Sequence, residues 1–406
     1  MGIPYCLPAF LLTFKSVFRY DAGVFLLRDD VKAQVTMEKS KVYFTDMRVS
    51  YNGDNLLQKL KKLIRKAGIE SIDFKNKFTA IKIHFGEPGN LSYLRPNFAK
   101  AVVEVIKDQG GKPFLTDCNT LYVGMRKNAL DHLDCAMENG FNYNTCGCQV
   151  IIGDGLKGTD EVDVPLEGTT FVKNAKIGKA IMDADIIISM NHFKAHEMLG
   201  VGGAIKNLGM GCGSRAGKME QHCTGKLTVD QSICKGCKIC AKNCGQNAIT
   251  YQENGKAYID QEKCVGCGRC LGACNFDAIQ APNFHSCEDV SMKMAEYAKA
   301  VVQNRPHFHI SFVMQVSPFC DCHPKNDTAV IPDVGILASF DPVALDTACA
   351  ELCNKQPIIP GCLIDKEENK GQDYFHAISP ATNWRVCMEH AQKIGIGTMD
   401  YELIRM

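Results

Sequence analysis

Two consecutive cysteine runs with identical spacing most constrain what this chain can fold into. Each run reads C-x2-C-x2-C-x3-C, and the second begins 30 residues after the first. The runs are Cys234, Cys237, Cys240 and Cys244, and then Cys264, Cys267, Cys270 and Cys274. In such a run three thiolates bind one iron–sulfur cluster and the fourth reaches the neighbouring cluster. The doubled spacing therefore predicts a bacterial-type two-cluster module rather than buried or disulfide-bonded cysteines.

The same rule predicts that the ligand sets cross between the runs. One 4Fe–4S cluster is expected on Cys234, Cys237, Cys240 and Cys274, and the other on Cys264, Cys267, Cys270 and Cys244. The usual run ends in Cys-Pro, but Gly245 and Asn275 follow the last cysteines here. Because proline has no N–H, its absence leaves an extra donor beside each cluster, which we expect to tune the potential rather than prevent ligation.

Composition limits the class of protein. The chain has 406 residues, 46% of them hydrophobic, which is enough for one large domain and a smaller one. Its 22 cysteines in a long chain with two metal-ligand runs favour a reducing cytoplasm, and we expect that of an anaerobe. The net charge of +1, without a basic stripe carrying aromatic residues, argues against nucleic acid as a partner. The apolar segment 4–14 is too short to cross a bilayer, so no membrane span is expected.

Strand and helix patterns alternate on both sides of the cysteine runs. Strand-like segments lie at 41–44, 78–85, 113–116, 150–152, 186–190 and 309–316. Helical periodicity is found at 54–67, 95–109, 126–139, 174–182, 289–303 and 342–352. This alternation predicts an α/β fold, with a mostly parallel sheet covered by helices on both faces and interrupted by a small α+β ferredoxin-like insert.

The chain is accordingly divided into four parts. Residues 1–36 are expected to be an extension that need not be structured, because a clear strand pattern follows Met37. Residues 37–222 form the first α/β part, 223–284 the insert, and 285–406 the second α/β part with a C-terminal tail. Two successive domains that flank the insert are the alternative.

A stretch rich in His, Lys and Gly follows the strand at 186–190. Ligands of open α/β sheets bind beyond the carboxyl ends of the strands, and glycine-rich loops let backbone N–H groups approach anions. We therefore predict a substrate or cofactor site here, suited to a small anionic substrate. Its candidate residues are His192, Lys194, His196, Lys206, Asn207 and Arg215. The alternative is a mobile loop with incidental cations.

The spacing of His192 and His196 would place both imidazoles on one face of a helix. Glu197 does not occupy the second position of an H-E-x-x-H motif, so a zinc protease is not expected.

Other strand ends supply weaker candidates. These residues are His84, Glu87, Arg95 and Asp117. Asp341, which precedes Pro342, is interpreted as a helix N-cap rather than as a catalyst.

The segment Cys320-Asp321-Cys322-His323 is a third constellation. Two cysteines one residue apart cannot easily form a disulfide with each other, but both can face a metal whose other ligands come from elsewhere, such as Cys212. Three interpretations stay open: an additional metal centre, a redox-active or nucleophilic thiol, and free, partly buried thiols.

Four segments resemble the bacterial and archaeal proteins of domain-of-unknown-function family 362, many of which carry a 4Fe–4S ferredoxin insert. The segments are TDCNTLYVGMRKNALDH, HFKAHEMLGVGGAIKNLGMG, PFCDC and ILASFDPVALD. The resemblance extends from Lys41 to about Leu352. It implies that the α/β parts form one domain and that these polar segments gather at one site. It strengthens the case for Cys320 and Cys322 as functional thiols and implies no reaction.

Together the patterns predict a low-potential iron–sulfur oxidoreductase. Electrons would pass from a soluble carrier such as a ferredoxin or flavodoxin, through two 4Fe–4S clusters, to the glycine-rich loop and the Cys320–Cys322 pair. One alternative is an electron-transfer relay or assembly protein without substrate chemistry. The other is a non-redox metal enzyme whose clusters are structural. The sequence does not specify the substrate or the donor.

Overall fold

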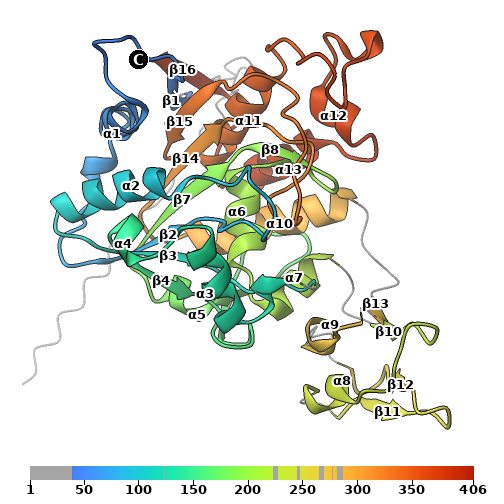
Figure 1. The fold of residues 1–406 in the computed structure, drawn as a ribbon. Helices are drawn as coiled ribbons and strands as arrows, with labels where there is room; N and C mark the ends of the chain where they lie inside the picture. The colour runs from blue at the N-terminus through green and yellow to red at the C-terminus, as the bar shows by residue number, and fades with distance from the viewer. Residues whose placement is uncertain are drawn as a thin grey trace, which may run out of the picture. The chain divides into compact units, whose positions relative to one another are not determined.

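The computed structural model describes residues 39–122, 124–222, 227–244, 247–264, 269–276, 278–280 and 287–406 (Figure 1). The predicted extension, residues 1–36, lies outside these ranges, as does Cys267. Within the described part of the chain, no helix combines the length and apolar character needed to cross a membrane.

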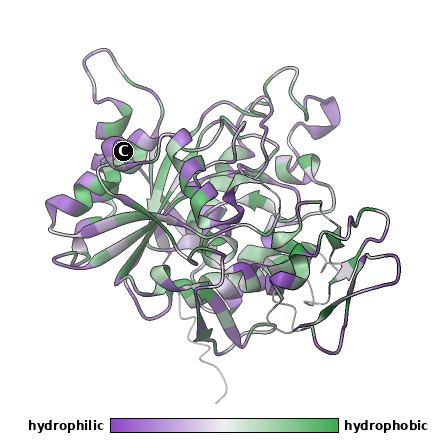
Figure 2. Ribbon diagram, turned by 60° about the horizontal axis from the view of Figure 1, so that its bottom comes forward, coloured by the Kyte–Doolittle hydropathy of each residue, from purple (hydrophilic) through white to green (hydrophobic). Residues whose placement is uncertain are grey.

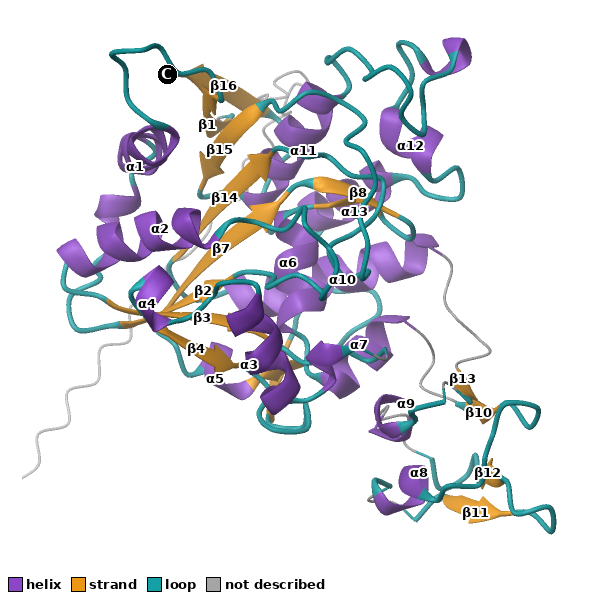
Figure 3. Ribbon diagram, viewed as in Figure 1, coloured by secondary structure: helices purple, strands orange, loops and turns teal. Residues whose placement is uncertain are grey.

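An eight-stranded sheet forms the centre of the α/β part (Figure 3). Its strand order is β16-β1-β15-β14-β7-β2-β3-β4. β15 runs antiparallel to β1 and β14, and the other neighbouring strands pair in parallel. The strands are β1 (Ser40–Asp46), β2 (Phe78–Lys82), β3 (Lys112–Asp117), β4 (Gln149–Ile152), β7 (Ile186–His192), β14 (His307–Val313), β15 (Gly335–Ser339) and β16 (Tyr401–Arg405). The predicted α/β fold with a mostly parallel sheet is confirmed.

Helices cover both faces of this sheet because its side chains alternate. Ile186 and Ile188 of β7 belong to a core with α1 and α2, whereas Ile187 belongs to a core with α6, α10, α11 and α13. Figure 2 colours the central strands largely as hydrophobic. The helices are α1 (Leu56–Lys66), α2 (Pro96–Asp108), α3 (Ala129–Glu138), α4 (Tyr143–Cys146), α5 (Lys179–Met182), α6 (Ala204–Cys212), α7 (Arg215–His222), α10 (Cys287–Val302), α11 (Pro342–Cys353), α12 (Tyr374–Ile378) and α13 (Trp384–Lys393). The described residues also form short 3-10 turns at Ile69–Ser71, Met125–Lys127 and Glu367–Asn369.

The direction of strand addition reverses between β2 and β7. After β2 the chain adds β3 and β4 on one side, and it then returns to place β7 on the other side of β2. At such a switch point the connections leave toward opposite faces of the sheet, which opens a crevice at the carboxyl ends of the strands.

Two sequence expectations about helices are wrong. Residues 174–178 form β6 (Asn174–Gly178), which pairs with β5 (Glu161–Pro165), and only the following four residues are helical. Ala175 and Ile177 are buried on either side of Lys176, so the strand period of two prevails over the helical period. His192 and His196 share no helix, since β7 ends at the first and β8 (Lys194–His196), paired with β9 (Gly200–Gly202), ends at the second.

The insert contains two small two-stranded sheets. β10 (Thr228–Val229) pairs with β13 (Ile279–Gln280), and β11 (Ile249–Tyr251) pairs with β12 (Ala257–Ile259). Two short helices, α8 (Ile239–Lys242) and α9 (Arg269–Ala273), begin within the two cysteine runs. Cys240, Cys270 and Cys274 are buried in the small core of this region, to which Leu121 and Met219 of the α/β part also belong.

The amino terminus of α6 is capped by a side chain from another helix. Asp346 of α11 accepts hydrogen bonds from the backbone N–H groups of Ala204 at 2.7 Å and Ile205 at 2.9 Å. A Cβ on the preceding Gly203 would lie 2.2 Å from Asp346 Oδ1. Glycine is therefore required at this position, and the cap fixes the start of the helix that carries Lys206.

Replacing this cap tests its contribution to stability. Asp346→Ala is expected to lower the free energy of unfolding by about 1–2 kcal/mol, because two buried N–H groups lose their acceptor. Asp346→Asn should cost less, since its amide oxygen still accepts one of these bonds. Chemical denaturation measures both, and an Asp346→Ala protein as stable as the wild type would contradict the capping role.

Candidate functional site

A cavity of about 610 Å³ lies at the carboxyl ends of β2, β3 and β7, against the loop that follows β14. It gathers most of the residues that the sequence predicts for the α/β part. The predicted residues in its wall are His84, Glu87, Asp117, His192, Lys194, His196, Lys206, Asn207 and Cys322. The cavity thus occupies the crevice that the strand order creates.

Four predicted residues lie outside this wall. Arg95 is exposed and precedes α2, while Arg215 at the start of α7 donates to the carbonyl oxygen of Lys127. Cys212 is buried at the end of α6, and burial raises the pKa of its thiol to about 11. Cys320 is fully buried behind Lys206.

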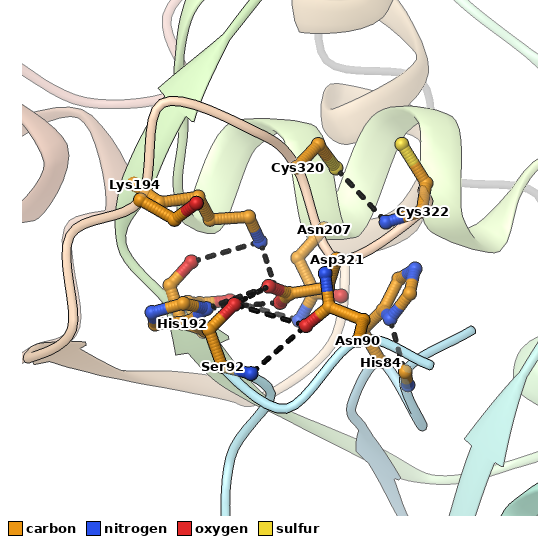
Figure 4. A network of polar contacts seen from close by, with 12 residues as sticks. His84, Asn90, Ser92, His192, Lys194, Asn207, Cys320, Asp321 and Cys322 are labelled. Carbon is orange, nitrogen blue, oxygen red and sulfur yellow. Dashed lines mark hydrogen bonds and ion pairs between the residues drawn. The ribbon is translucent and has the colours of Figure 1, made fainter. Parts of the chain in front are cut away.

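Asp321 holds the two sides of the site together (Figure 4). Its carboxylate accepts from His192 Nδ1 at 2.9 Å and from Lys194 Nζ at 3.0 Å. His192 Nε2 lies 2.8 Å from the carbonyl oxygen of Met314, so both ring nitrogens lie against oxygen atoms. Burial alone would raise the pKa of Asp321, but the charges of His192 and Lys194 hold it well below its usual range.

A second network joins the ends of β2 and β3. Lys82 Nζ lies 3.0 Å from Asp117 Oδ1, and Arg126 donates from Nε to Glu87 at 2.8 Å. Asn207 of α6 accepts from Lys82 at 2.7 Å. Because Asp117 and Glu87 are thus neutralised by buried cations, they organise the wall of the cavity rather than present free carboxylates to it.

His84 presents a hydrogen-bond donor to the cavity. Its Nδ1 accepts from the backbone N–H of Gly86 at 3.0 Å. Burial, followed by the charge of Arg126, lowers the pKa of His84 well below its usual range. The ring is therefore neutral at pH 7 and carries its proton on Nε2.

The sulfur of Cys320 is surrounded by donors. Lys206 Nζ lies 2.8 Å from Sγ, and the backbone N–H of Cys322 donates to it at 3.4 Å. Burial opposes ionisation, but hydrogen bonding from the Cys322 thiol and the charges of Lys206 and Lys194 hold the pKa of Cys320 well below its usual range. The hydrogen bond to Cys320 in turn raises the pKa of Cys322, so the pair holds one proton between two sulfurs.

The same corner offers metal-ligand atoms. Donor atoms of His196, Cys320 and Cys322 lie within 4.8 Å of one another, as do those of Glu197, Cys322 and His323. One histidine and two thiolates suit a soft metal such as zinc.

The hydrogen bonds around His196 nevertheless favour a thiolate over a metal centre. Nδ1 of His196 accepts from the N–H of Met198 at 3.1 Å, so the neutral ring carries its proton on Nε2. Coordination through either nitrogen would break this bond, because the other nitrogen must then hold the proton. The Lys206 ammonium also occupies a lone pair of Cys320.

The cysteines of the insert fit a metal-cluster site in their described part. Cys234, Cys237, Cys240 and Cys274 line one small cavity. These four thiols are free, and the N–H of Ala257 donates to Cys234 Sγ at 3.5 Å. Four thiols that line one cavity, one of them accepting an N–H···S bond, form a donor set suited to an iron–sulfur cluster.

Sequence reasoning missed Lys82, Arg126 and the role of Asp321. Lys82 is a charged residue within the apolar strand pattern 78–85, and that interruption was the available signal. The sequence around Arg126 contains no such signal, because its partners Glu87 and Asp117 come from other segments of the chain.

The fold and the site define an α/β protein with a cysteine-rich insert and a polar cavity at the switch point of its sheet. The chain belongs to the family described as Domain of unknown function (DUF362), which matches residues 79–351. None of the curated proteins matches it.

Two solved structures are similar to the chain at low identity. The lactate racemase apoprotein from Thermoanaerobacterium thermosaccharolyticum shares 9% identity over 75% of this chain and 54% of its own, with a TM-score of 0.34. A structural-genomics protein from Thermotoga maritima shares 10% over 73% and 57%, with a TM-score of 0.38. The chain spans little more than half the length of either, and similarity of this extent carries no inference about activity.

Removing the charge of Asp321 tests the central network. Asp321→Asn should lower the free energy of unfolding by about 3–5 kcal/mol, because the buried ammonium of Lys194 loses its counterion. The low pKa of Asp321 means that its contribution is present above the ordinary carboxyl pKa of about 4 and is lost as the pH falls. The stability difference between wild type and variant should therefore shrink in acid.

Asp327→Asn is the matched control, since Asp327 is exposed on the same loop. Denaturation at several pH values should show almost no change for this variant. Equal stability of the two variants would contradict the role of Asp321.

Proposed function

We propose that this protein is an iron–sulfur oxidoreductase whose insert holds two 4Fe–4S clusters and delivers electrons to the cavity of the α/β part. One observation carries the proposal most strongly: Cys274 of the second run lines the same small cavity as three cysteines of the first run. Crossed ligand sets of this kind are typical of two-cluster modules. Cys264, Cys270, Cys244 and Cys267 would then hold the second cluster.

A 4Fe–4S cluster supplies single electrons at a potential set by burial and by hydrogen bonds to sulfur. This chain contributes such bonds through backbone N–H groups: Ala257 donates to Cys234 at 3.5 Å, and Ala248 donates to Cys244 at 3.3 Å. Burial of Cys240 and Cys274 adds a low-dielectric surrounding.

Contacts between the insert and the cavity support the route of the electrons. Lys127 Nζ donates to the carbonyl oxygen of Cys274 at 3.2 Å, and Leu271 of α9 belongs to the cavity wall. A proposed cluster ligand therefore lies next to a residue of the α/β part.

Within the cavity we assign the chemistry to the Cys320–Cys322 pair. Cys322 reaches the cavity wall, and Lys206 and His196 hold Cys320 as an anion. An additional metal centre on these two cysteines and His196 is the second candidate, favoured by the proximity of their donor atoms.

The donor in this proposal is an acidic soluble carrier such as a ferredoxin or flavodoxin. Cys237 is exposed, and the exposed Lys235 and Lys238 flank it, which suits an acidic partner. The free thiols of the described residues suit the reducing cytoplasm of an anaerobe.

Cluster content tests the proposal directly. Anaerobically purified protein should contain about eight irons, and Cys234→Ser and Cys274→Ser should remove the same EPR signal of the reduced protein. Cys244→Ser should instead affect the other cluster, together with Cys264→Ser. Cys287→Ser, outside both runs, is the control that should retain full iron and both signals. Loss of different clusters in Cys234→Ser and Cys274→Ser would contradict the crossed assignment.

Substitutions in the cavity separate an oxidoreductase from a relay. Lys206→Met and His196→Gln should retain the clusters and their reduction by a carrier, but should slow reoxidation by substrate at least tenfold, because Cys320 loses its main donors. The exposed Lys173→Gln serves as the control. Unchanged reoxidation in both variants would favour a relay or assembly protein, and turnover with clusters held in one oxidation state would favour a non-redox metal enzyme.

A further inference from the structure

The charged side chains in the cavity wall are mostly neutralised by partners within the protein. Lys82 is paired with Asp117 at 3.0 Å, Lys194 with Asp321 at 3.0 Å, and Lys206 faces the sulfur of Cys320 at 2.8 Å. Lys194 and Lys206, which the sequence predicts as candidates for binding a small anion, therefore already have counterions within the protein.

Lys218 of α7 differs from these cations. It belongs to the cavity wall, is only 7% exposed, and donates from Nζ to the carbonyl oxygen of Gly213 at 2.5 Å. Across the described ranges, no carboxylate lies within ion-pair distance of its ammonium. A buried ammonium bound to a neutral carbonyl is costly unless an anion joins it.

The nearby carboxylate of Asp154 does not take this place. Its Oδ1 accepts from the backbone and the side chain of Asn119 at 2.9 and 2.8 Å, and its Oδ2 has no hydrogen-bond partner. The charge of Lys218 opposes the rise that burial causes in the pKa of Asp154, but the two side chains form no ion pair.

Besides Lys218, helix α7 contributes His222 to the wall, and several apolar side chains lie around it. Met210, Met219, Leu271 and Val290 contribute to the wall, together with Leu121. A cavity of about 610 Å³ has the size of a site for a small organic molecule. Its chemistry matches a ligand with an apolar body and one anionic group.

We propose that Lys218 is the anion anchor of this cavity, and that the ligand is a mainly apolar molecule bearing one carboxylate, sulfonate or phosphate group. This inference names the substrate class for the site of the proposed oxidoreductase and rests on that function for its role as a substrate. Anion binding itself requires no cluster, so the two ideas can fail separately.

The test uses two probes of nearly equal shape and the full-length protein. The anionic probe is 8-anilinonaphthalene-1-sulfonate, and the neutral one is N-phenyl-1-naphthylamine, which lacks the sulfonate. Equilibrium dialysis or calorimetry measures their affinities. The wild type is expected to bind the anionic probe more tightly, and Lys218→Gln should weaken that probe about tenfold or more while leaving the neutral probe within about twofold.

Lys218→Arg should retain most of the affinity for the anionic probe, and the exposed Lys173→Gln should retain all of it. Unchanged neutral-probe binding also shows that Lys218→Gln has folded with its cavity intact. The proposal is overturned if neither probe binds the wild type, if Lys218→Gln leaves the anionic probe unaffected, or if it weakens both probes equally.

A further variant examines Asp154. Asp154→Asn should change the affinity for the anionic probe by no more than about twofold. A gain as large as the loss in Lys218→Gln would identify Asp154 as the counterion of Lys218 and would overturn the proposal.

Discussion

The buried carboxylate of Asp321 is the interaction on which the site depends. It comes from the loop after β14 and binds His192 at the end of β7 and Lys194 at the start of β8, 129 and 127 residues earlier in the chain. Removing the charges of Asp321 and Lys194 from water costs free energy, and only their close geometry compensates for it. The loop after β14 is therefore held in one position relative to the sheet, where an exposed ion pair would contribute little.

This position determines what the flanking cysteines can do. Asp321 stands between Cys320 and Cys322, so its anchoring fixes both sulfurs at once. One sulfur is directed to Lys206 of α6, and the other reaches the cavity. The cap that Asp346 places on α6 fixes the lysine from the opposite side. Two buried carboxylates thus determine the environment of one thiolate, although neither touches it.

Much of the fold could be predicted from local patterns. The strands and helices around β2, α2, β3 and β7 follow from apolar periodicity, and the cysteine spacing predicted that Cys274 lies with the first run, whose cysteines line the same small cavity. The parallel sheet followed from the alternation of these elements, but its strand order did not, because pairing of β1 with β15 or β14 with β7 joins distant segments. The segment 174–182 was misjudged because a few residues fit both periods.

The candidate site was predictable in location and less so in chemistry. His192, Lys194 and Lys206 could be placed at a strand end, but their counterions come from a loop more than a hundred residues away. The sequence therefore could not separate neutralised cations from available ones. Arg215 and Lys218 illustrate this: they lie three residues apart on one helix, yet only the second belongs to the cavity wall.

Helix α7 contributes both to the cavity wall and to the small core of the insert. Lys218 belongs to the cavity wall, and the next residue, Met219, also packs in the small core that contains Cys240, Cys270 and Cys274. In the proposed oxidoreductase, thermodynamic linkage would couple the two: a ligand that binds the cavity more tightly in one oxidation state of the clusters must shift their midpoint potential by the same free energy. Through the two-turn helix α7, binding of a ligand in the cavity would then change the reduction potential of the clusters.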